Sequence, residues 1–292
     1  CYGQRGLNMA VLGRGTAYGS CSLLHALGAG YGASLSLDLP AKVMIRDNPD
    51  RQEIVDPHGL LDAVKTSWVE AGLPIGEEEY HWMVRSEVPM GMGLKSSSAV
   101  AAAAVLALAD ATKTVLETPQ VVELAVRAQI AAGCTVTGSV DDTWAAVTPG
   151  WKVVNPQVPI EQGIALEGLW PEPEEWAVFV VERGERTVEI NPESFARAQV
   201  NFQKALVAIQ QGALDTSVTE NGRGVALSTA DQAGRKICND LLVWGARCAG
   251  ISGSGPSIVF MIPSVNESAI DRILDTLSSR GLSVFETAIR TE

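Results

Sequence analysis

The residues best suited to chemistry lie in one short stretch of the N-terminal half of the chain. Two glycines, Gly91 and Gly93, precede Lys95 and three serines, and an alanine-rich run follows directly. Glycine lets the backbone approach a ligand closely, and the free N–H groups at the start of a helix carry a partial positive charge. Lys95 adds a full positive charge at the same place. The stretch therefore predicts a site for an anion such as a phosphate group at a helix N-terminus.

The spacing of this stretch differs from two common nucleotide-binding motifs. A Walker A sequence needs Lys directly after its last glycine, but here Leu94 separates Gly93 from Lys95. The dinucleotide-binding pattern fails because Ser96 stands where the third glycine belongs. A loop that merely caps a buried alanine-rich helix is the alternative to a phosphate-binding loop.

The run from Gly91 to Ala99 resembles the phosphate loop of the GHMP kinases, which include galactokinase, homoserine kinase and mevalonate kinase. Most members have glycine at the position of Lys95, and lysine there with a third serine resembles one branch, the archaeal-type shikimate kinases. The resemblance implies ATP and Mg²⁺ as cofactors, with Ser97 as a metal ligand and Lys95 as a catalytic residue that neutralises the γ-phosphate or a substrate carboxylate. The implied cofactor-binding residues are Pro89, Met90, Gly91, Met92, Gly93, Leu94, Lys95, Ser96, Ser97, Ser98 and Ala99.

Two adjacent carboxylates, Asp141 and Asp142, follow a glycine turn inside an otherwise apolar segment. From the residues alone, a turn capped by Asp141 and a catalytic carboxylate remain alternatives. The segment resembles the Ser/Thr-Gly-x-x-Asp element of the GHMP kinases, which implies that Asp141 acts on the acceptor hydroxyl. Asp142 is the alternative, because neighbouring side chains of an extended segment point to opposite faces. Some members place a metal-binding glutamate about a turn or more before this element, where this chain reads Ala128-Gln129-Ile130-Ala131, so the second metal ligand stays open.

Two more glycine-rich segments complete the resemblance. The first runs from Gly13 to Gly19 and the second from Gly250 to Pro256, so the three motifs span most of the chain. Taken alone, the first is as readily a structural turn as a ligand loop, and the second is a weak signal. An acidic substrate requires a guanidinium or ammonium group, and the candidates are Arg14, Arg223 and Lys95. The implied substrate-binding residues are Arg14, Gly253, Ser254 and Arg223.

Composition narrows the classes of function. The 292 residues are 46% hydrophobic, enough to bury a large core, and the net charge of −12 argues against nucleic acid or an anionic membrane as partner. No apolar run predicts a membrane span or a secretory signal. The five cysteines form no C-x-x-C pair and predict reduced thiols in the cytoplasm. The three histidines are scattered, which argues against zinc.

Hydrophobic periodicity and turn residues predict intermixed strands and helices without strict alternation, which indicates an α+β fold. The first glycine segment is predicted to be a structural turn or a ligand loop, and 156–176 a connecting loop. Strands are predicted at 7–12, 33–39, 42–45, 86–88, 134–140, 176–182 and 282–289. A strand with a turn is predicted within 144–154, and a tight glycine loop that enters an apolar strand within 248–262. Helices are predicted at 22–27, 60–71, 100–111, 118–133 and 267–279, with two or three more within 192–244.

The resemblance implies a two-lobed GHMP kinase fold with a ribosomal-protein-S5-like N-terminal half, 1–155, and a ferredoxin-like C-terminal half, 156–292. The implied activity is ATP-dependent phosphorylation of shikimate to shikimate 3-phosphate, in the synthesis of chorismate and aromatic amino acids. The partners would be shikimate and ATP, without nucleic acid or membrane, and the protein a cytoplasmic monomer or homodimer. A sister kinase such as homoserine kinase and a non-catalytic binding protein of the same fold are the alternatives. The glycine pattern that an NAD-dependent oxidoreductase requires is not found in this sequence.

Overall fold

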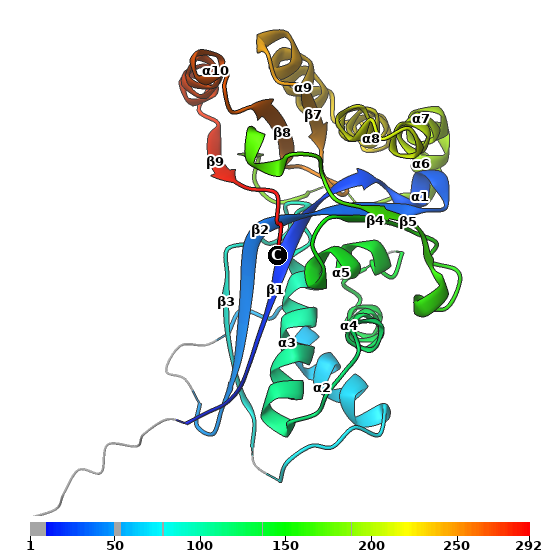
Figure 1. The fold of residues 1–292 in the computed structure, drawn as a ribbon, viewed down its shortest axis with the longest axis vertical. Coiled ribbons are helices and arrows are strands. Elements are labelled where there is room, and N and C mark those ends of the chain that lie inside the picture. Colours follow the sequence, from blue (N-terminus) through cyan, green and yellow to red (C-terminus); the bar gives the residue numbers. More distant parts are fainter. Residues whose placement is uncertain (1–9, 50–53, 78, 136, 188) are drawn as a thin grey trace, which may run out of the picture.

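The computed structural model describes residues 10–49, 54–77, 79–135, 137–187 and 189–292, and these form two antiparallel sheets flanked by helices (Figure 1). Part of the strand predicted at 7–12 lies outside the described residues. The first sheet has the order β1-β2-β4-β5, with β3 also paired to β2, and the second has the order β7-β8-β6-β9. The first contains β1 (Val11–Leu24), β2 (Gly32–Arg46), β3 (His81–Ser86), β4 (Trp151–Val154) and β5 (Ile164–Gly168); the second contains β6 (Trp176–Glu182), β7 (Cys248–Ile251), β8 (Ile258–Pro263) and β9 (Ser283–Thr287).

Helices cover one side of each sheet, so that the mixed α+β prediction is confirmed (Figure 1). Against the first sheet lie α3 (Ser96–Thr112) and α5 (Val140–Val147), and α2 (Leu60–Glu70) and α4 (Thr118–Ala131) pack on α3, while the short α1 (Ala26–Ala29) follows β1. The second sheet is accompanied by α6 (Pro192–Arg197), α7 (Gln199–Gln210), α8 (Leu214–Ser228), α9 (Gln232–Trp244) and α10 (Glu267–Ser279). Two single 3₁₀ turns, η1 (Ile160–Gln162) and η2 (Pro173–Glu175), flank β5.

The alanine-rich helix α3 is the buried centre of the first half. Its small side chains let it lie close to β1, where Gly13 and Gly15 face it at alternate positions of the strand. A Cβ added at Gly15 would collide with the carbonyl oxygen of Ala103. A Cβ added at Gly13 would collide in the same way with the carbonyl oxygen of Ala107, one helical turn further along α3. The segment is therefore neither the structural turn nor the ligand loop that the sequence left as alternatives. The segment is the middle of β1, and its glycines serve helix packing.

Several other element boundaries differ from the prediction. The two strands predicted at 33–39 and 42–45 are one strand, β2, and the helix predicted at 22–27 is largely the end of β1. The strand predicted at 86–88 lies earlier, in β3, and four helices rather than two or three fill 192–244. The predicted loop 156–176 contains β5, which extends the first sheet beyond the expected boundary at residue 155.

The segment around the two aspartates is the largest error. Residues 134–140 were expected to be extended because Thr and Val favour strands, but Val140 begins helix α5 after Ser139, whose φ is 50°. Asp141 and Asp142 thus stand in the first turn of a helix, where carboxylates are stabilised by the free N–H groups. Adjacent residues of a helix are not directed to opposite faces, so the argument that only one carboxylate can face the site no longer holds.

The end of the chain joins the two sheets. Leu37 of β2 forms an isolated bridge with Ile289, and the Asp38 N–H donates to the Ala288 carbonyl at 2.8 Å. The Arg290 guanidinium lies 3.9 Å from the Tyr18 ring centre and donates to the Ala146 carbonyl in α5 at 3.3 Å. None of the helices in the described part of the chain combines the length and hydropathy that a membrane span requires.

Candidate active site

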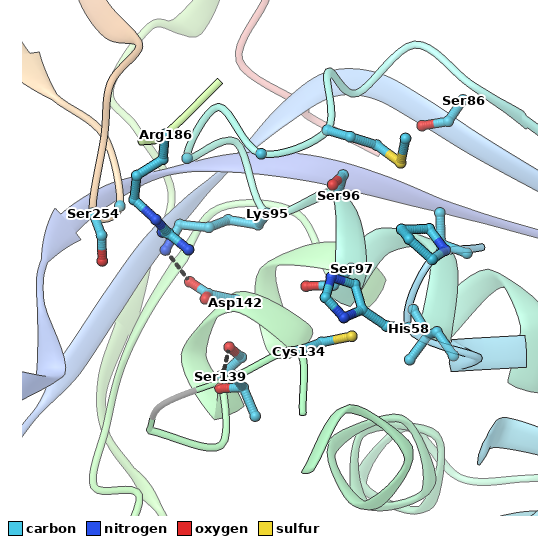
Figure 2. Close-up of a pocket in the computed structure, with 18 of the residues that line it drawn as sticks. His58, Ser86, Lys95, Ser96, Ser97, Cys134, Ser139, Asp142, Arg186 and Ser254 are labelled. Atoms are coloured by element: carbon cyan, nitrogen blue, oxygen red, sulfur yellow. Dashed lines mark hydrogen bonds and ion pairs between the residues drawn. The ribbon is translucent and has the colours of Figure 1, made fainter. Parts of the chain in front are cut away.

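A cavity of about 430 Å³ opens between the two halves of the structure, at the start of α3 (Figure 2). Its floor is the loop between β3 and α3 together with the first turn of α5. One end is polar and charged and the other is mostly apolar. The charged end contains His25, Lys95, Asp141, Asp142, Arg186 and Ser254, and the apolar end contains Ile54, Val55, Pro57, Leu60, Val84 and Met90.

The floor loop takes its shape from three left-handed residues. Gly91, Gly93 and Lys95 have φ values of 69°, 87° and 67°. This conformation suits glycine, whereas a residue with a Cβ pays about 1–2 kcal/mol for it. Lys95 therefore occupies a position where glycine would be unstrained, and α3 begins at the next residue. The N–H groups of its first turn have no partner within the helix, and Ser96 and Ser97 of that turn line the cavity, as an anion site requires.

The C-terminal glycine segment packs against this loop. The Ser252 hydroxyl donates to the Gly93 carbonyl at 2.9 Å, and the Ser257 N–H donates to the Met92 carbonyl at 3.1 Å. A Cβ at Gly93 would collide with the Ser252 carbonyl oxygen, so only glycine allows this approach. The Gly253 N–H in turn donates to the Ser22 hydroxyl at the end of β1. Segments separated by more than 200 residues thus hold the loop in place.

Lys95 and the two aspartates form one buried polar cluster. The Lys95 ammonium donates to Asp142 Oδ1 at 2.6 Å (Figure 2), and both side chains are only about a tenth exposed, at 13% and 11%. The Ser34 hydroxyl on β2 lies 2.7 Å from Asp142 Oδ1 and 3.0 Å from Asp141 Oδ2. Ser34 therefore links the two carboxylates, and Lys95 connects this charged cluster to the floor loop.

Burial and the charges of the neighbouring groups shift the pKa values of Lys95, Asp142 and Asp141 by different amounts and in different directions. Burial alone lowers the pKa of Lys95, but the nearby Asp142 and Asp141 charges more than offset it, so its pKa is raised. Burial alone raises the pKa of Asp142, but the charge and hydrogen bond of Lys95 bring it below its ordinary value. Burial and the Asp142 charge hold the pKa of Asp141 well above its ordinary value. Asp142 is thus the ionised partner of Lys95, and Asp141 is the carboxyl that binds a proton readily.

Comparison with known proteins agrees with this geometry. Residues 60–150, which contain the floor loop, α3 and the aspartates, match the GHMP kinases N terminal domain. A protein named shikimate kinase from Methanothrix thermoacetophila is 28% identical over 95% of this chain and 93% of its own length. Another shikimate kinase, from Pyrococcus furiosus, is 28% identical over 86% of this chain and 90% of its own.

Solved structures agree at the level of the fold. The Methanococcus jannaschii mevalonate kinase superposes with a TM-score of 0.75 over 99% of this chain and 100% of that one, at 14% identity. A putative homoserine kinase from Listeria monocytogenes gives a TM-score of 0.65 over 94% and 96%, at 17% identity. Residues 60–150 thus match a GHMP kinases N terminal domain, and the whole chain has the fold of these solved kinase structures.

Not every residue of the predicted GHMP kinase site reaches the cavity. Its lining includes Met90, Gly91, Gly93, Lys95, Ser96 and Ser97 of the floor loop and helix start, both aspartates, and Gly253 and Ser254. Leu94, Ser98 and Ala99 are buried beneath the floor, and Pro89 and Met92 do not line it. Arg14 is exposed on β1, where its N–H donates to Asp110, and Arg223 is exposed on α8 and paired with Glu220. Neither arginine lines the cavity.

Gln129 connects the elements of this GHMP kinase site, a role that its sequence position did not reveal. It is fully buried on α4, its amide oxygen accepts from Ser98 at 2.8 Å, and its amide nitrogen donates to Thr143 at 3.0 Å. It therefore ties the helix that follows the floor loop to the helix that carries the aspartates. Ser97 lies 3.4 Å from the same amide oxygen, a weak contact that leaves its hydroxyl available to the cavity.

Sequence reasoning missed two other residues of the cavity, His25 and Arg186. His25 follows β1 and bonds to Ser254, and Arg186 lies in the segment after β6. No local pattern marks either residue, because each reaches the cavity only through the packing of the second half against the first.

Proposed function

We propose that this protein is a shikimate kinase, which transfers the γ-phosphoryl group of ATP to the 3-hydroxyl of shikimate. The observation that carries the proposal is the buried ion pair between Lys95 and Asp142 of α5, because Lys95 occupies a position of the floor loop that is strained for any residue but glycine. Similarity to proteins named shikimate kinase over nearly the whole chain supports the choice of substrate.

The two ends of the cavity suit the two substrates. Ile54, Val55 and Met90 at the apolar end offer surface for a nucleotide base, while the floor loop and the first turn of α3 meet its phosphates. The acceptor then occupies the charged end, beside Lys95 and the aspartates. This arrangement sets the acceptor hydroxyl and the γ-phosphate side by side, which is the main requirement of phosphoryl transfer.

Each group of the charged cluster has a distinct role in this proposal. Asp141 accepts the proton of the attacking hydroxyl, because its raised pKa suits a general base. Lys95 neutralises charge on the transferred phosphoryl group, and its ammonium is held in place by Asp142. Ser34 keeps the two carboxylates at a fixed separation.

The donor set also fits Mg²⁺. This ion commonly binds through one or two carboxylates, water and substrate phosphates rather than a full protein cage. The described residues contain no cluster of three or more His, Cys, Asp or Glu, but the Ser97 hydroxyl makes only a weak 3.4 Å contact with Gln129, and both Ser97 and the two aspartates line the cavity. Ser97 and one aspartate are the proposed ligands, and the ion would supply positive charge at the phosphates. Gln129 is not proposed as a ligand, since its oxygen already accepts from Ser98.

The four described cysteines, Cys21, Cys134, Cys238 and Cys248, are free thiols, which supports a cytoplasmic enzyme within this proposal. Whether the enzyme is a monomer or a homodimer stays a prediction.

The test is a coupled assay of the purified protein with ATP and Mg²⁺ across shikimate, homoserine and mevalonate, with the phosphorylated product identified by ³¹P NMR. We expect turnover with shikimate and formation of the 3-phosphate. Turnover with homoserine or mevalonate alone would reassign the substrate within the same family. Binding of ATP without turnover of any acceptor would instead support a non-catalytic binding protein.

A further inference from the structure

At the charged end of the cavity, three residues from distant parts of the chain meet beyond the Lys95–Asp142 pair. His25 follows β1, Arg186 follows β6 and Ser254 lies in the turn between β7 and β8. Figure 2 shows the Arg186 side chain reaching toward Lys95 and Asp142, with Ser254 on the same side of the cavity. All three residues line the cavity. The roles assigned so far to the phosphate loop and the aspartates leave these three unused.

The hydrogen bonds of His25 fix which way the Ser254 hydroxyl can point. His25 Nδ1 accepts from the Leu27 N–H at 3.3 Å, so the ring proton of the neutral side chain is on Nε2. Nε2 lies 3.0 Å from Ser254 Oγ and donates to it. Burial, helped by the Lys95 charge, lowers the pKa of His25 to about 3, which keeps the ring neutral. The Ser254 proton is then free to be donated to a ligand.

The His25 ring itself is held rigidly. It lies against the Phe195 ring at a centroid distance of 4.4 Å, and its backbone N–H donates to Asn221 Oδ1 at 2.9 Å. A fixed ring gives Ser254 a fixed donor direction, which is the property of a recognition site rather than of a solvent-exposed serine.

Arg186 adds a positive charge at the same end. Its backbone N–H donates to the Gly91 carbonyl at 3.2 Å, which ties it to the floor loop. Within the described ranges, its guanidinium forms no hydrogen bond or ion pair, in contrast to the neighbouring Arg183, which makes two bonds to Asp231. A guanidinium without a partner among the described side chains attracts an anionic ligand, and its planar fork matches a carboxylate.

We infer that Arg186 and Ser254 bind the carboxylate of the acceptor, with His25 as the positioning residue for Ser254. The inference rests on the proposed function and assigns the group that recognises the acid, in place of Arg14 and Arg223. In shikimate the carboxylate and the 3-hydroxyl are on ring carbons separated by one carbon. An acceptor held at Arg186 by its carboxylate therefore presents that hydroxyl toward the neighbouring Lys95–Asp142 pair and Asp141. The site selects hydroxy acids over neutral alcohols.

The experiment compares shikimate with its methyl ester, which keeps the hydroxyls and loses the charge. The variants are Arg186→Gln and Ser254→Ala, with Arg197→Gln as the control, since Arg197 is an exposed arginine of α6 outside the cavity. For the wild type we expect kcat/KM for the acid to exceed that for the ester by about 10–100-fold, as for a hydrogen bond to a charged group. Arg186→Gln should bring the two values within a few-fold, with KM for ATP unchanged.

Ser254→Ala should lower kcat/KM for both compounds, because an ester carbonyl still accepts the serine hydrogen bond. The control should behave as the wild type. His25→Phe keeps the ring volume against Phe195 and tests the positioning role. It should lower kcat/KM for shikimate in the wild-type background and have no further effect in Ser254→Ala, since it acts only through Ser254. Melting temperatures of all variants report whether the fold is retained.

Three outcomes would overturn the inference. The first is that Arg186→Gln retains the wild-type ratio of kcat/KM for shikimate to kcat/KM for its methyl ester. The second is an additive loss in the His25→Phe, Ser254→Ala double variant, which would make His25 merely structural. The third is a wild type without turnover of shikimate, which removes the proposed function as well and is recognised before any variant is made.

Discussion

Two glycine-rich segments of the N-terminal half are similar in sequence but have different structural roles. In the first, Gly13 and Gly15 alternate along β1 and face the backbone of α3, which leaves no room for a side chain. In the second, Gly91 and Gly93 have positive φ and turn the chain so that the start of α3 faces the cavity. The first pair sets the distance between a strand and a helix, and the second sets the direction of that helix's N-terminus.

The difference shows that glycine spacing by itself does not separate packing from ligand binding. What separates them is the surrounding element: an extended strand with an alanine helix opposite, or a turn between a strand and a helix. Changes in the first segment should therefore act on stability, and changes in the second, and in the aspartates that face it, should act on catalysis.

The largest expected effect lies opposite the second segment, at Asp141. Asp141→Asn should lower kcat by about 10²–10⁴-fold with the fold retained, since it removes the proposed proton acceptor. Asp142→Asn is the matched variant and should cost less, because an amide oxygen still accepts the Lys95 hydrogen bond. Steady-state kinetics and melting temperature of both variants provide the measurement. A larger loss of kcat in Asp142→Asn would exchange the two roles.

Next in size is the loop residue Lys95. Lys95→Ala should lower kcat by about 10²–10³-fold, the usual cost of removing one preorganised donor from a site of developing negative charge. It also leaves Asp142 buried without its partner, so the melting temperature should fall. Unchanged kcat and KM values would mean that the ion pair is structural, and the second segment would then resemble the first.

A smaller effect, on stability alone, is expected in the first segment. Gly15→Ala places a Cβ against the Ala103 carbonyl and should lower the free energy of unfolding by about 1–3 kcal/mol, as overpacking does. The kcat of the remaining folded protein should be unchanged. Thr16→Ala, on the exposed face of the same strand, is the control and should shift stability by less than about 0.5 kcal/mol. Denaturant unfolding gives both values, and a loss of kcat in Gly15→Ala without loss of stability would contradict the comparison.

The smallest expected effect measures the strain at Lys95 itself. Lys95→Gly and Lys95→Ala both remove the ammonium, but glycine adopts a φ of 67° without cost. The glycine variant should therefore be about 1 kcal/mol more stable than the alanine variant, with equal loss of kcat. Equal stabilities would show that the loop relaxes when the lysine is removed.

Local sequence patterns were sufficient for the floor loop and for most helices and strands. The Gly-Gly-Lys-Ser order before an alanine run predicts a loop at a helix start, and α2, α4, β6 and α10 follow from their periodicity and caps. The segment at 134–140 misled because Thr and Val favour strands, while packing of the buried Trp144 in α5 decides the outcome. His25, Gln129 and Arg186 could not be found, because their partners lie on other elements: Ser254, Ser98 with Thr143, and the Gly91 backbone.

The C-terminal segment that joins the two sheets has a consequence for how the enzyme is made. The Thr287 hydroxyl donates to the Asp38 carbonyl, 249 positions earlier, and Arg290 supplies a cation to the carbonyl end of α5, the helix that carries the aspartates. During synthesis, every residue that lines the cavity has been added by Ser254, yet α5 gains this anchor only when Arg290 is added. The helix that carries the aspartates therefore gains this contact only after every residue that lines the cavity has been synthesised.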